Sequence, residues 1–510
     1  MGNVISFQSR ALSFFALFSL FSSNLLIFSL DASEGSQSSG KLPKFTNVIR
    51  QAGIGKIGTL GQTAAWGDFN NDRCEDLIVS NTDRKGESQN VFLFKNNCDG
   101  TFTDVTAASG IGNMRLRSAA WADFDNDNLL DLVVGTIKAG APPILYKNQG
   151  RGVFADVSSK TGITKQGGAV RHVVWVDFDR DGLLDIFQAN LSGSPFLYSG
   201  KKDGTFEEVS SKTGFGGKFR VNSHLFFDFN NDGFMDLFLA SDGLNRFYQN
   251  NGKGSFTDST DEVGLGGDPG WDSVAACAGD FDNDGFIDLY VVNIFSTTRV
   301  RNALYKNNNG KSFTDITEKT ATGDVGDGRT CAWVDFDGDG RLDLFTTNHL
   351  NPSRLFRNLG SGKFIDLASQ AGLDKPIDVF AAAWGDYNND GFMDVFLNGH
   401  IGMALMKNGS NNNRVLTVRL KGDGKKTNTS AVGSRVIVSS PNGRQLREVS
   451  GGRGNCEQDM LPVHFGIGGE EKIEIRVEWT SGAVCNYKDI IIKGASNFLI
   501  SENGCKIVRS

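Results

Sequence analysis

The feature that most constrains this chain is an acidic string of nine residues, Asp-Phe-Asp-x-Asp-Gly-x-x-Asp, which occurs seven times with small variations. The copies recur every 51 to 55 residues and begin at Asp68, Asp123, Asp177, Asp228, Asp280, Asp335 and Asp386. Oxygen ligands at positions 1, 3, 5 and 9 of a short loop suit a hard cation such as Ca²⁺. A repeat of roughly 50 residues made of short β-segments is typical of one propeller blade. The sequence therefore predicts a seven-bladed β-propeller with one cation loop per blade.

Apolar residues around each loop keep the same register. The position two before the first Asp is Trp in five repeats, as in Trp66, and the position after that Asp is Phe or Tyr in all seven. Short apolar strands such as DLVV follow the ninth position, and Asn/Gly-rich turns complete a second hairpin. Each repeat thus predicts four antiparallel strands, and we expect the aromatic rings to form the core between them. The predicted fold class is all-β.

The two ends of the repeat array predict how the ring closes. Residues 45–55, FTNVIRQAGIG, match a fourth-strand pattern but follow no acidic loop. The seventh repeat begins near Ala381 and runs into NGSNNN without a fourth strand. We expect the N-terminal segment to supply that strand, because closure removes open sheet edges.

The predicted side-chain ligands are the residues at positions 1, 3, 5 and 9 of each loop. For loops 1 to 4 they are Asp68, Asn70, Asp72, Asp76; Asp123, Asp125, Asp127, Asp131; Asp177, Asp179, Asp181, Asp185; and Asp228, Asn230, Asp232, Asp236. For loops 5 to 7 they are Asp280, Asp282, Asp284, Asp288; Asp335, Asp337, Asp339, Asp343; and Asp386, Asn388, Asp390, Asp394.

Position 6 of such a loop requires a positive φ, and five loops have Gly there. Loop 2 has Asn128, which tolerates that conformation, whereas loop 1 has Arg73, so loop 1 is predicted to be the weakest site. An Asp-Gly turn is also ordinary hairpin chemistry, but seven acidic clusters in register would repel themselves without a counter-cation. We expect up to seven structural Ca²⁺ ions; Mg²⁺ is disfavoured because it prefers fewer protein ligands.

Polar residues also recur at the other end of the strands. Arg117, Arg171 and Arg329 lie six residues before a first Asp, Arg220 is slightly displaced from that register, and His349 and His400 follow two second strands. These six residues predict a partly cationic mouth at the central channel, able to bind acidic groups of a protein or glycan. The alternative is that they only solvate loop ends.

The N-terminus predicts entry into the secretory pathway. Residues 11–30 are apolar, and we interpret residues 1–31 as a signal peptide or a retained signal-anchor. No other segment is long and apolar enough to span a bilayer. Three sequons, at Asn190, Asn408 and Asn428, predict glycosylation.

The seven cysteines allow disulfides in an oxidising compartment. We expect one bridge between Cys74 and Cys98, and another between Cys485 and either Cys456 or Cys505. Cys277 and Cys331 lie in apolar strands and are interpreted as buried thiols.

From about Asn413 a different β-pattern begins. VLTVRL, SRVIVSS and KIEIRVEWTSG alternate apolar and polar residues and predict a small β-sandwich-like domain. The run Gly451-Gly452-Arg453-Gly454 follows a strand but opens no helix, so we interpret it as a turn. The predicted organisation is a linker at 32–43, the propeller at 44–410 and the C-terminal domain at 411–510.

On these motifs the chain resembles two known families. The seven acidic loops are similar to FG-GAP repeats of the kind in integrin α-subunit propellers. VGSRVIV, GRQLREVSGGRGNCEQ, HFGIG and VEWTSG resemble the ASPIC/UnbV domain, although Cys456 and Thr480 stand where Ser and Pro are usual. The pairing resembles the secreted cartilage acidic protein group, which implies an extracellular, Ca²⁺-binding, adhesion-like role.

The predicted function is a secreted or cell-surface calcium-binding propeller that binds a ligand without catalysis. The carboxylates that could carry out acid–base chemistry are committed to the loops, and the chain has only five His residues. The alternatives are a carbohydrate-active enzyme, a lyase or hydrolase using His349, His400 and Arg329, or a lectin. The partner is expected to be an extracellular protein or glycan. Nucleic acid is excluded, because the chain has no basic run.

Overall fold

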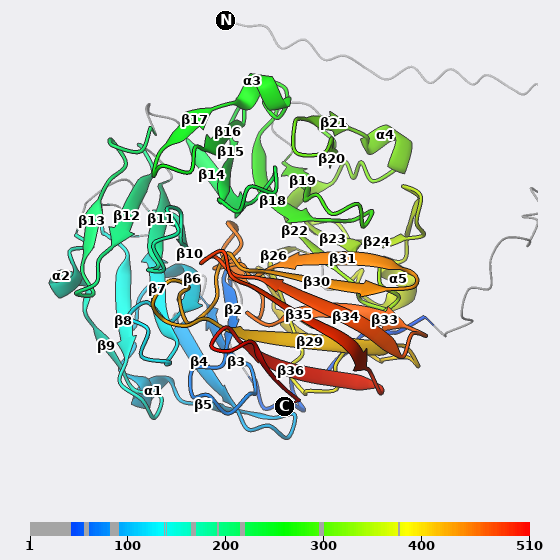
Figure 1. Ribbon diagram of the computed structural model, residues 1–510, viewed down its shortest axis with the longest axis horizontal. Coiled ribbons are helices and arrows are strands. Elements are labelled where there is room, and N and C mark those ends of the chain that lie inside the picture. The colour runs from blue at the N-terminus through cyan, green and yellow to red at the C-terminus, as the bar shows by residue number, and fades with distance from the viewer. Residues whose placement is uncertain are drawn as a thin grey trace, which may run out of the picture. The chain divides into compact units, whose positions relative to one another are not determined.

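The computed structural model describes residues 42–509 except 56–60, 82–90, 137, 139, 165–169, 191–192, 215–219, 295–299 and 376–377. The predicted signal segment, residues 1–31, and most of the predicted linker lie outside the described residues. No helix in the described part of the chain is long and apolar enough to cross a membrane. The residues from Gly40 onward form one compact unit, and the prediction of an all-β fold is confirmed (Figure 1).

In the described part of the chain the repeats form seven sheets whose repeat strands are antiparallel, and we number them 1 to 7 in chain order. Sheets 1 to 3 contain β2 (Ala64–Gly67), β3 (Asp76–Ser80), β4 (Val91–Asn96), β5 (Phe102–Asp104); β6 (Leu116–Ala122), β7 (Asp131–Thr136), β8 (Ile144–Asn148), β9 (Phe154–Asp156); and β10 (Val170–Val176), β11 (Asp185–Asn190), β12 (Phe196–Gly200), β13 (Phe206–Glu208).

Sheets 4 and 5 contain β14 (Val221–Phe227), β15 (Asp236–Ser241), β16 (Arg246–Asn250), β17 (Phe256–Asp258); and β18 (Ser273–Gly279), β19 (Asp288–Asn293), β20 (Ala303–Asn307), β21 (Phe313–Asp315). Sheets 6 and 7 contain β22 (Asp327–Val334), β23 (Asp343–His349), β24 (Arg354–Asn358), β25 (Phe364–Asp366); and β26 (Val379–Gly385), β27 (Asp394–Gly399), β28 (Met403–Lys407), β1 (Thr46–Asn47).

Among the described residues, five single-turn helices follow the outermost strands of five sheets, and a residue with positive φ comes directly after each helix. They are α1 (Thr106–Ser109), α2 (Ser158–Thr161), α3 (Thr260–Val263), α4 (Thr317–Thr320) and α5 (Ala368–Ala371).

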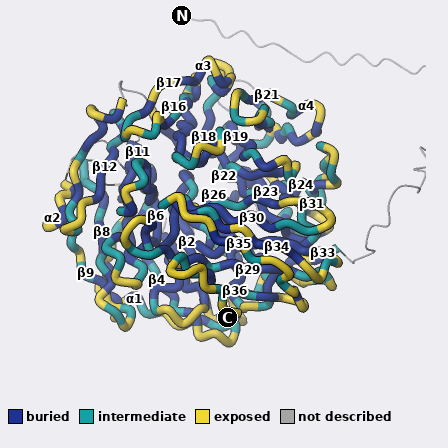
Figure 2. Tube along the Cα trace, viewed as in Figure 1, coloured by how far each residue is buried: buried dark blue, intermediate teal, exposed yellow. Residues whose placement is uncertain are grey.

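The sheets close into a ring. The first strand of each sheet contacts the first strand of the next, and β26 contacts β2. The N-terminal strand β1 pairs with β28, with Thr46 opposite Lys407, so the predicted closure by the N-terminal segment is confirmed. This pairing covers the edge of sheet 7 that would otherwise be open. In Figure 2 the inner strands are buried and exposed residues follow the outer turns.

The core of the ring lies between neighbouring sheets. The ring that follows one loop's first Asp stacks on the Trp of the next sheet, as in Phe69 and Trp121, whose centroids are 6.1 Å apart. Phe281 and Trp333 repeat this contact at 5.6 Å. Such ring pairs add about 0.5–1.5 kcal/mol beyond the area they bury. The expectation that these aromatics form a core is confirmed.

The C-terminal domain forms two four-stranded sheets, as expected for a sandwich. One contains β33 (Val463–Gly468), β29 (Arg414–Lys421), β36 (Ala495–Ser501) and β37 (Lys506–Arg509); the other contains β31 (Gly443–Glu448), β30 (Arg435–Ser440), β34 (Lys472–Glu478) and β35 (Val484–Ile491). Val436, Val477 and Phe465 lie in the core shared by the two sheets. These strands, orange to red in Figure 1, cross in front of the ring.

A segment of this domain enters the centre of the ring. Residues 450–462, which we call the plug segment, contain β32 (Glu457–Gln458), and β32 pairs in parallel with β2. Gln458 exchanges two hydrogen bonds with the Trp121 backbone, and the Trp384 N–H donates to Asp459 at 2.7 Å. A turn is present at residues 454–456, in agreement with the interpretation of Gly451–Gly454 as a turn, and Gly451 also bridges to Trp175 of the ring. Gly454 lies so close to the His224 backbone that a Cβ would sit 1.6 Å from its carbonyl oxygen.

Three disulfides are present among the described residues. Cys74 pairs with Cys98, as predicted, and Cys485 pairs with Cys505 rather than with the buried Cys456. The interpretation of Cys277 and Cys331 as thiols was wrong, because these two are bonded to each other. Their strands, β18 and β22, are neighbours in the ring and bring the two Cα atoms to 5.8 Å.

Candidate metal sites

Each acidic loop joins the first and second strands of its sheet, and its backbone turns at two left-handed residues. Position 6 has a positive φ in all seven loops, including Arg73 and Asn128 at 70°. Position 4 does too, from Asn389 at 56° to Gly338 at 69°. The requirement at position 6 was predicted and is confirmed; the one at position 4 was missed, although Asn there in five loops was a visible signal.

The carboxylates at positions 1 and 9 are fixed by backbone N–H donors. In six loops the first Asp accepts one or two N–H groups from positions 5 and 6, as Asp386 does from Asp390 and Gly391. In loops 1 to 6 the ninth residue accepts one N–H from position 2 and another from the end of the third strand, as Asp76 does from Phe69 and Asn96. A carboxylate has about four lone-pair sites, so capacity for a cation remains.

Carboxylate oxygens converge in at least three loops. Within loops 2, 3 and 5, three acidic side chains each place one oxygen within 4.8 Å of the others; these are Asp123, Asp125, Asp127; Asp177, Asp179, Asp185; and Asp280, Asp282, Asp288. Asp125, Asp280, Asp337 and Asp394 each have one buried oxygen without a hydrogen-bond partner in the described part of the chain, and Asp177 has two. Hard-cation ligation suits such oxygens.

The electrostatics of the loops match this geometry. Burial raises the pKa of Asp76 to about 9 and that of Asp131 to about 8. Burial, followed by the neighbouring Asp181 and Asp179, raises the pKa of Asp177 well above its usual range. Burial makes the ionised form of these clustered carboxylates unfavourable. A bound cation would favour the ionised form, so the arrangement suits a cation site.

Basic side chains already approach several loops. The ammonium of Lys147 contacts Asp125 and lies 3.0 Å from Asp127, and Lys306 contacts Asp282 and lies 2.7 Å from Asp284. In loop 6 the guanidinium of Arg357 lies 2.6 Å from Asp337. Lys95 and Lys407 lie 3.6 Å from Asp72 and Asp390 in loops 1 and 7.

The C-terminal domain adds further partners, because it covers the loop face of the ring. Arg419 lies 2.6 Å from Glu75 and 3.7 Å from Asp68, and Arg435 lies 2.9 Å from Asp228. The Gly466 N–H donates to Asp335 at 3.0 Å, and the Thr429 hydroxyl contacts Asp123.

Loop 3 differs from the others. In the described part of the chain no Lys or Arg lies within ion-pair distance of Asp177, Asp179, Asp181 or Asp185. Its position-4 side chain, Arg180, instead donates to the Thr480 carbonyl at 2.7 Å. Loop 3 therefore combines a carboxylate cage with the least compensation by protein cations.

Neighbouring loops are linked by the side chains at position 4. The side-chain amides of Asn71, Asn231 and Asn283 each donate to the backbone carbonyl at position 6 of the next loop, at 2.7–3.0 Å. Asn389 of loop 7 donates to Arg73 of loop 1 at 3.3 Å and so continues the links around the ring. These hydrogen bonds couple the conformations of the loops that they join.

Some arginines of the predicted mouth are buried against neighbouring strands, and others are accessible to solvent. Arg117 donates to Gln62, and the partly buried Arg171 donates to the Asn222 carbonyl at 3.1 Å. Burial lowers the pKa of Arg171 to about 10. Arg220 is exposed and pairs with Asp242 at 3.2 Å, whereas Arg329 pairs with Asp327 at 3.1 Å and lies over the Phe380 ring.

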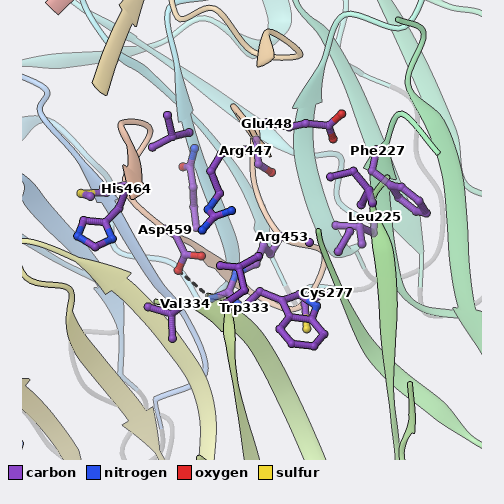
Figure 3. A pocket seen from close by; sticks show the side chains of 18 of the residues that line it. Leu225, Phe227, Cys277, Trp333, Val334, Arg447, Glu448, Arg453, Asp459 and His464 are labelled. Atoms are coloured by element: carbon purple, nitrogen blue, oxygen red, sulfur yellow. Dashed lines mark hydrogen bonds and ion pairs between the residues drawn. The ribbon is translucent and has the colours of Figure 1, made fainter. Parts of the chain in front are cut away.

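The plug segment closes the channel below this mouth. Asn455 donates to the Arg329 carbonyl, and the Cys456 N–H donates to His172 at 3.0 Å. A cavity of about 180 Å³ lies between the plug segment and the first strands of sheets 4 to 6. Figure 3 shows Arg453 and Asp459 beside each other there, with Trp333 and Cys277 below them. The structure does not place any of the six predicted mouth residues in this cavity.

His349 and His400, by contrast, are brought together. Both imidazoles face the carboxylate of Asp378, a residue that sequence analysis missed because it precedes β26 outside any recurring motif. Burial is the main cause that lowers the pKa of His400.

The three predicted glycosylation sites are buried. Asn190, Asn408 and Asn428 are fully buried, and their amide nitrogens donate to backbone carbonyls. A glycan on that nitrogen has no room in this fold, so the structure argues against glycosylation at these positions. A sequon is a local pattern, and burial is decided by residues far away in the sequence.

Comparisons with known proteins agree with this architecture. The model of the FG-GAP-like repeat family matches residues 68–134, 177–239, 228–291, 292–346 and 335–397, and the ASPIC and UnbV model matches 424–503. Cartilage acidic protein 1 from Xenopus tropicalis is 25% identical over 446 residues, covering 82% of this chain and 61% of that protein. The human protein is 25% identical over 452 residues, covering 83% and 60%. The chain thus spans less than two thirds of the length of these relatives.

Solved structures are also similar in outline. YCF48 bound to D1 peptide has a TM-score of 0.44 at 8% identity, covering 71% of this chain and 94% of that one. Sqt1 from Saccharomyces cerevisiae has a TM-score of 0.42 at 12% identity, covering 73% and 99%.

Proposed function

This chain belongs to the FG-GAP-like repeat family and carries an ASPIC and UnbV domain, and from this premise we propose that it is an extracellular protein whose repeat loops bind Ca²⁺. The ions are structural. The ring they stabilise presents a non-enzymatic binding surface to a protein or glycan. The enzyme and lectin alternatives stay predictions.

The observation that carries the calcium proposal is the carboxylate cage of loop 3. Both oxygens of Asp177 are buried, and the backbone N–H groups of Gly182 and Arg180 approach them without completing a well-formed hydrogen bond. Oxygens of Asp179 and Asp185 lie within 4.8 Å. A buried, unpaired carboxylate is costly, and a hard divalent cation removes that cost. Loops 2 and 5 repeat the convergence, but lysines compete there.

The same geometry supports a structural role for the ions. Four of the seven loops are linked to the next loop through position 4, so loss of the ions would loosen the ring. If Ca²⁺ exceeds its Kd about tenfold, each site adds roughly 1.4 kcal/mol. Seven sites would then add about 10 kcal/mol, as much as a typical net folding stability.

Two features support the extracellular setting. Three disulfides in one chain are typical of an oxidising compartment. Sites of this type in extracellular modules bind Ca²⁺ with a Kd of about 10⁻⁴–10⁻³ M, which the cytosol would leave empty. The C-terminal domain covers the loop face, so we place the ligand surface on the opposite mouth, around Arg220, Arg329, His349 and His400.

Thermal unfolding of the full secreted chain in millimolar Ca²⁺ and in excess EGTA tests the proposal. We expect a large fall in Tm on chelation, restored by Ca²⁺ but only partly by equal Mg²⁺. An unchanged Tm would overturn the structural role of the ions. Partner capture with wild type and Arg220→Ala, both in Ca²⁺, tests the mouth separately.

A further inference from the structure

We propose that His349, Asp378 and His400 form a second kind of metal site, for a divalent transition ion of the zinc class, on the face of the ring opposite the calcium loops. This site uses different ligands, a different face and a different metal chemistry from the sites proposed above. It is independent of whether those loops bind Ca²⁺.

Three separate elements bring the ligands together. His349 is the last residue of β23, His400 directly follows β27, and Asp378 directly precedes β26. Sheets 6 and 7 are neighbours, so these strand ends meet at one edge of the mouth. The three ligand atoms lie within 4.8 Å of one another. Nδ1 of His349 contacts one oxygen of Asp378, and Nδ1 of His400 lies 3.5 Å from the other.

The carboxylate is fixed before any ligand arrives. Asp378 has a φ of 65°, and its carbonyl accepts the His400 N–H at 3.2 Å. Its side chain is only 4% exposed, and the two imidazole nitrogens are its hydrogen-bond or ion-pair partners in the described part of the chain. Left-handed backbone is tolerated by Asp and Asn but costs most residues about 1 kcal/mol or more. The fold thus stabilises an unusual conformation that directs one buried carboxylate at two histidines.

The imidazoles are also held in place. The Phe380 ring lies 4.0 Å from the His400 ring and 5.9 Å from the His349 ring, centroid to centroid. Arg329 covers Phe380 at 4.8 Å and is paired with Asp327 at 3.1 Å. These contacts leave each histidine side chain 28% exposed, so one side of the cluster is open to solvent.

The donor set selects the metal. Two imidazole nitrogens and one carboxylate oxygen suit Zn²⁺ or Cu²⁺, whereas Ca²⁺ and Mg²⁺ prefer oxygen alone. Tetrahedral bonds of about 2.1 Å put ligand atoms roughly 3.4 Å apart, a spacing close to that seen between His400 and Asp378. The fourth position falls on the open side, where water or an acidic group of a partner would bind.

Zinc binding to the full chain in millimolar Ca²⁺ tests the site, and the zinc assigned to this cluster is the part of the binding that the histidine double variant removes. The histidine background is low: the chain has five His, and His172, His224 and His464 are buried. We expect one equivalent of Zn²⁺ by titration calorimetry, and a Co²⁺ complex whose absorption spectrum reports nitrogen ligation.

Asp378→Asn keeps the left-handed backbone and should weaken Zn²⁺ binding at least tenfold, and the double variant His349→Gln/His400→Gln should abolish it. Asp327→Asn, which changes a neighbouring carboxylate outside the cluster, should retain it. Circular dichroism and Tm in Ca²⁺ check that each variant is folded. Failure of the wild type to bind Zn²⁺, or binding that survives the double variant, would overturn the proposal.

Discussion

Nη1 of Arg435 lies 2.9 Å from Oδ2 of Asp228, and both side chains are buried, at 8% and 0% exposure. Arg435 begins β30 of the C-terminal domain, and Asp228 opens loop 4 of the ring. The pair therefore places a C-terminal guanidinium against a proposed calcium ligand. A buried ion pair thus joins the two domains, and we expect each domain to lose stability when the other is removed.

Arg435→Met should destabilise the protein, because it leaves the buried Asp228 carboxylate without its partner. Removal of one member of a buried pair costs about 3–5 kcal/mol. We expect that loss in EGTA and a smaller one in millimolar Ca²⁺, where the ion would neutralise Asp228. Denaturant unfolding measures both. Arg476→Met, at an exposed pair, should change stability by less than about 0.5 kcal/mol. Equal losses with and without Ca²⁺ would show that no cation shares Asp228.

The effect of Asp177→Asn on the free energy of unfolding should have opposite signs with and without calcium. In EGTA we expect higher stability, because the variant removes a buried carboxylate that no Lys or Arg neutralises in the described part of the chain. In Ca²⁺ we expect lower stability, by about 1.4 kcal/mol for a tenfold loss of affinity. Asp68→Asn is the matched variant: its carboxylate lies 3.7 Å from Arg419, so it should lose stability in EGTA and respond weakly to Ca²⁺. If both variants gained stability in EGTA, or both lost it, the proposed difference between loops 3 and 1 would be contradicted.

The repeated part of the fold was predictable because each copy repeats the same local physics. Trp66 and Phe69 flank the loop that Asp68 opens, and their equivalents recur at fixed spacing, so the strands, the loops and the ring closure could be read from one alignment of the chain with itself. Asn71 shows the limit of that method. Its spacing was visible, but its hydrogen bond to Asn128 joins two loops and appears only in three dimensions.

Features that occur once were not predictable. The plug segment contains Cys456 and Glu457 between two strands, and nothing local indicates that they enter the ring. The Cys277–Cys331 bond and the meeting of His349 with Asp378 depend on which strands become neighbours. The burial of Asn408, a predicted glycosylation site, has the same origin. A local sequence pattern determines the secondary structure that a segment favours, whereas its burial and its contacts depend on segments far away in the sequence.

Glu457 should make stability depend on pH. Burial raises its pKa from 4.5 to about 8, so the folded protein holds the proton more tightly than the unfolded chain. The contribution of Glu457 to the free energy of unfolding should therefore be fully present below about pH 4.5 and be lost as pH rises toward 8, by at most about 1.4 kcal/mol per pH unit. Glu457→Gln keeps an acceptor for the Ala382 N–H and should flatten that slope, whereas Glu474→Gln, on an exposed position, should not. Urea unfolding at several pH values measures the slope. An unchanged slope in Glu457→Gln would contradict the assignment.

Gly454→Ala tests whether the plug segment stabilises the ring. Its Cβ would lie 1.6 Å from the His224 carbonyl oxygen and 2.5 Å from the His224 nitrogen, both backbone atoms that cannot rotate away. The plug segment must then shift, which disturbs the bonds of Cys456 to His172 and of Gln458 to Trp121. We expect a loss of about 1–3 kcal/mol or more, with a change in tryptophan fluorescence. Gly469→Ala is the control, because a Cβ there meets nothing within 4 Å. If Gly454→Ala were as stable as the wild type, the plug segment would not be needed to stabilise the ring.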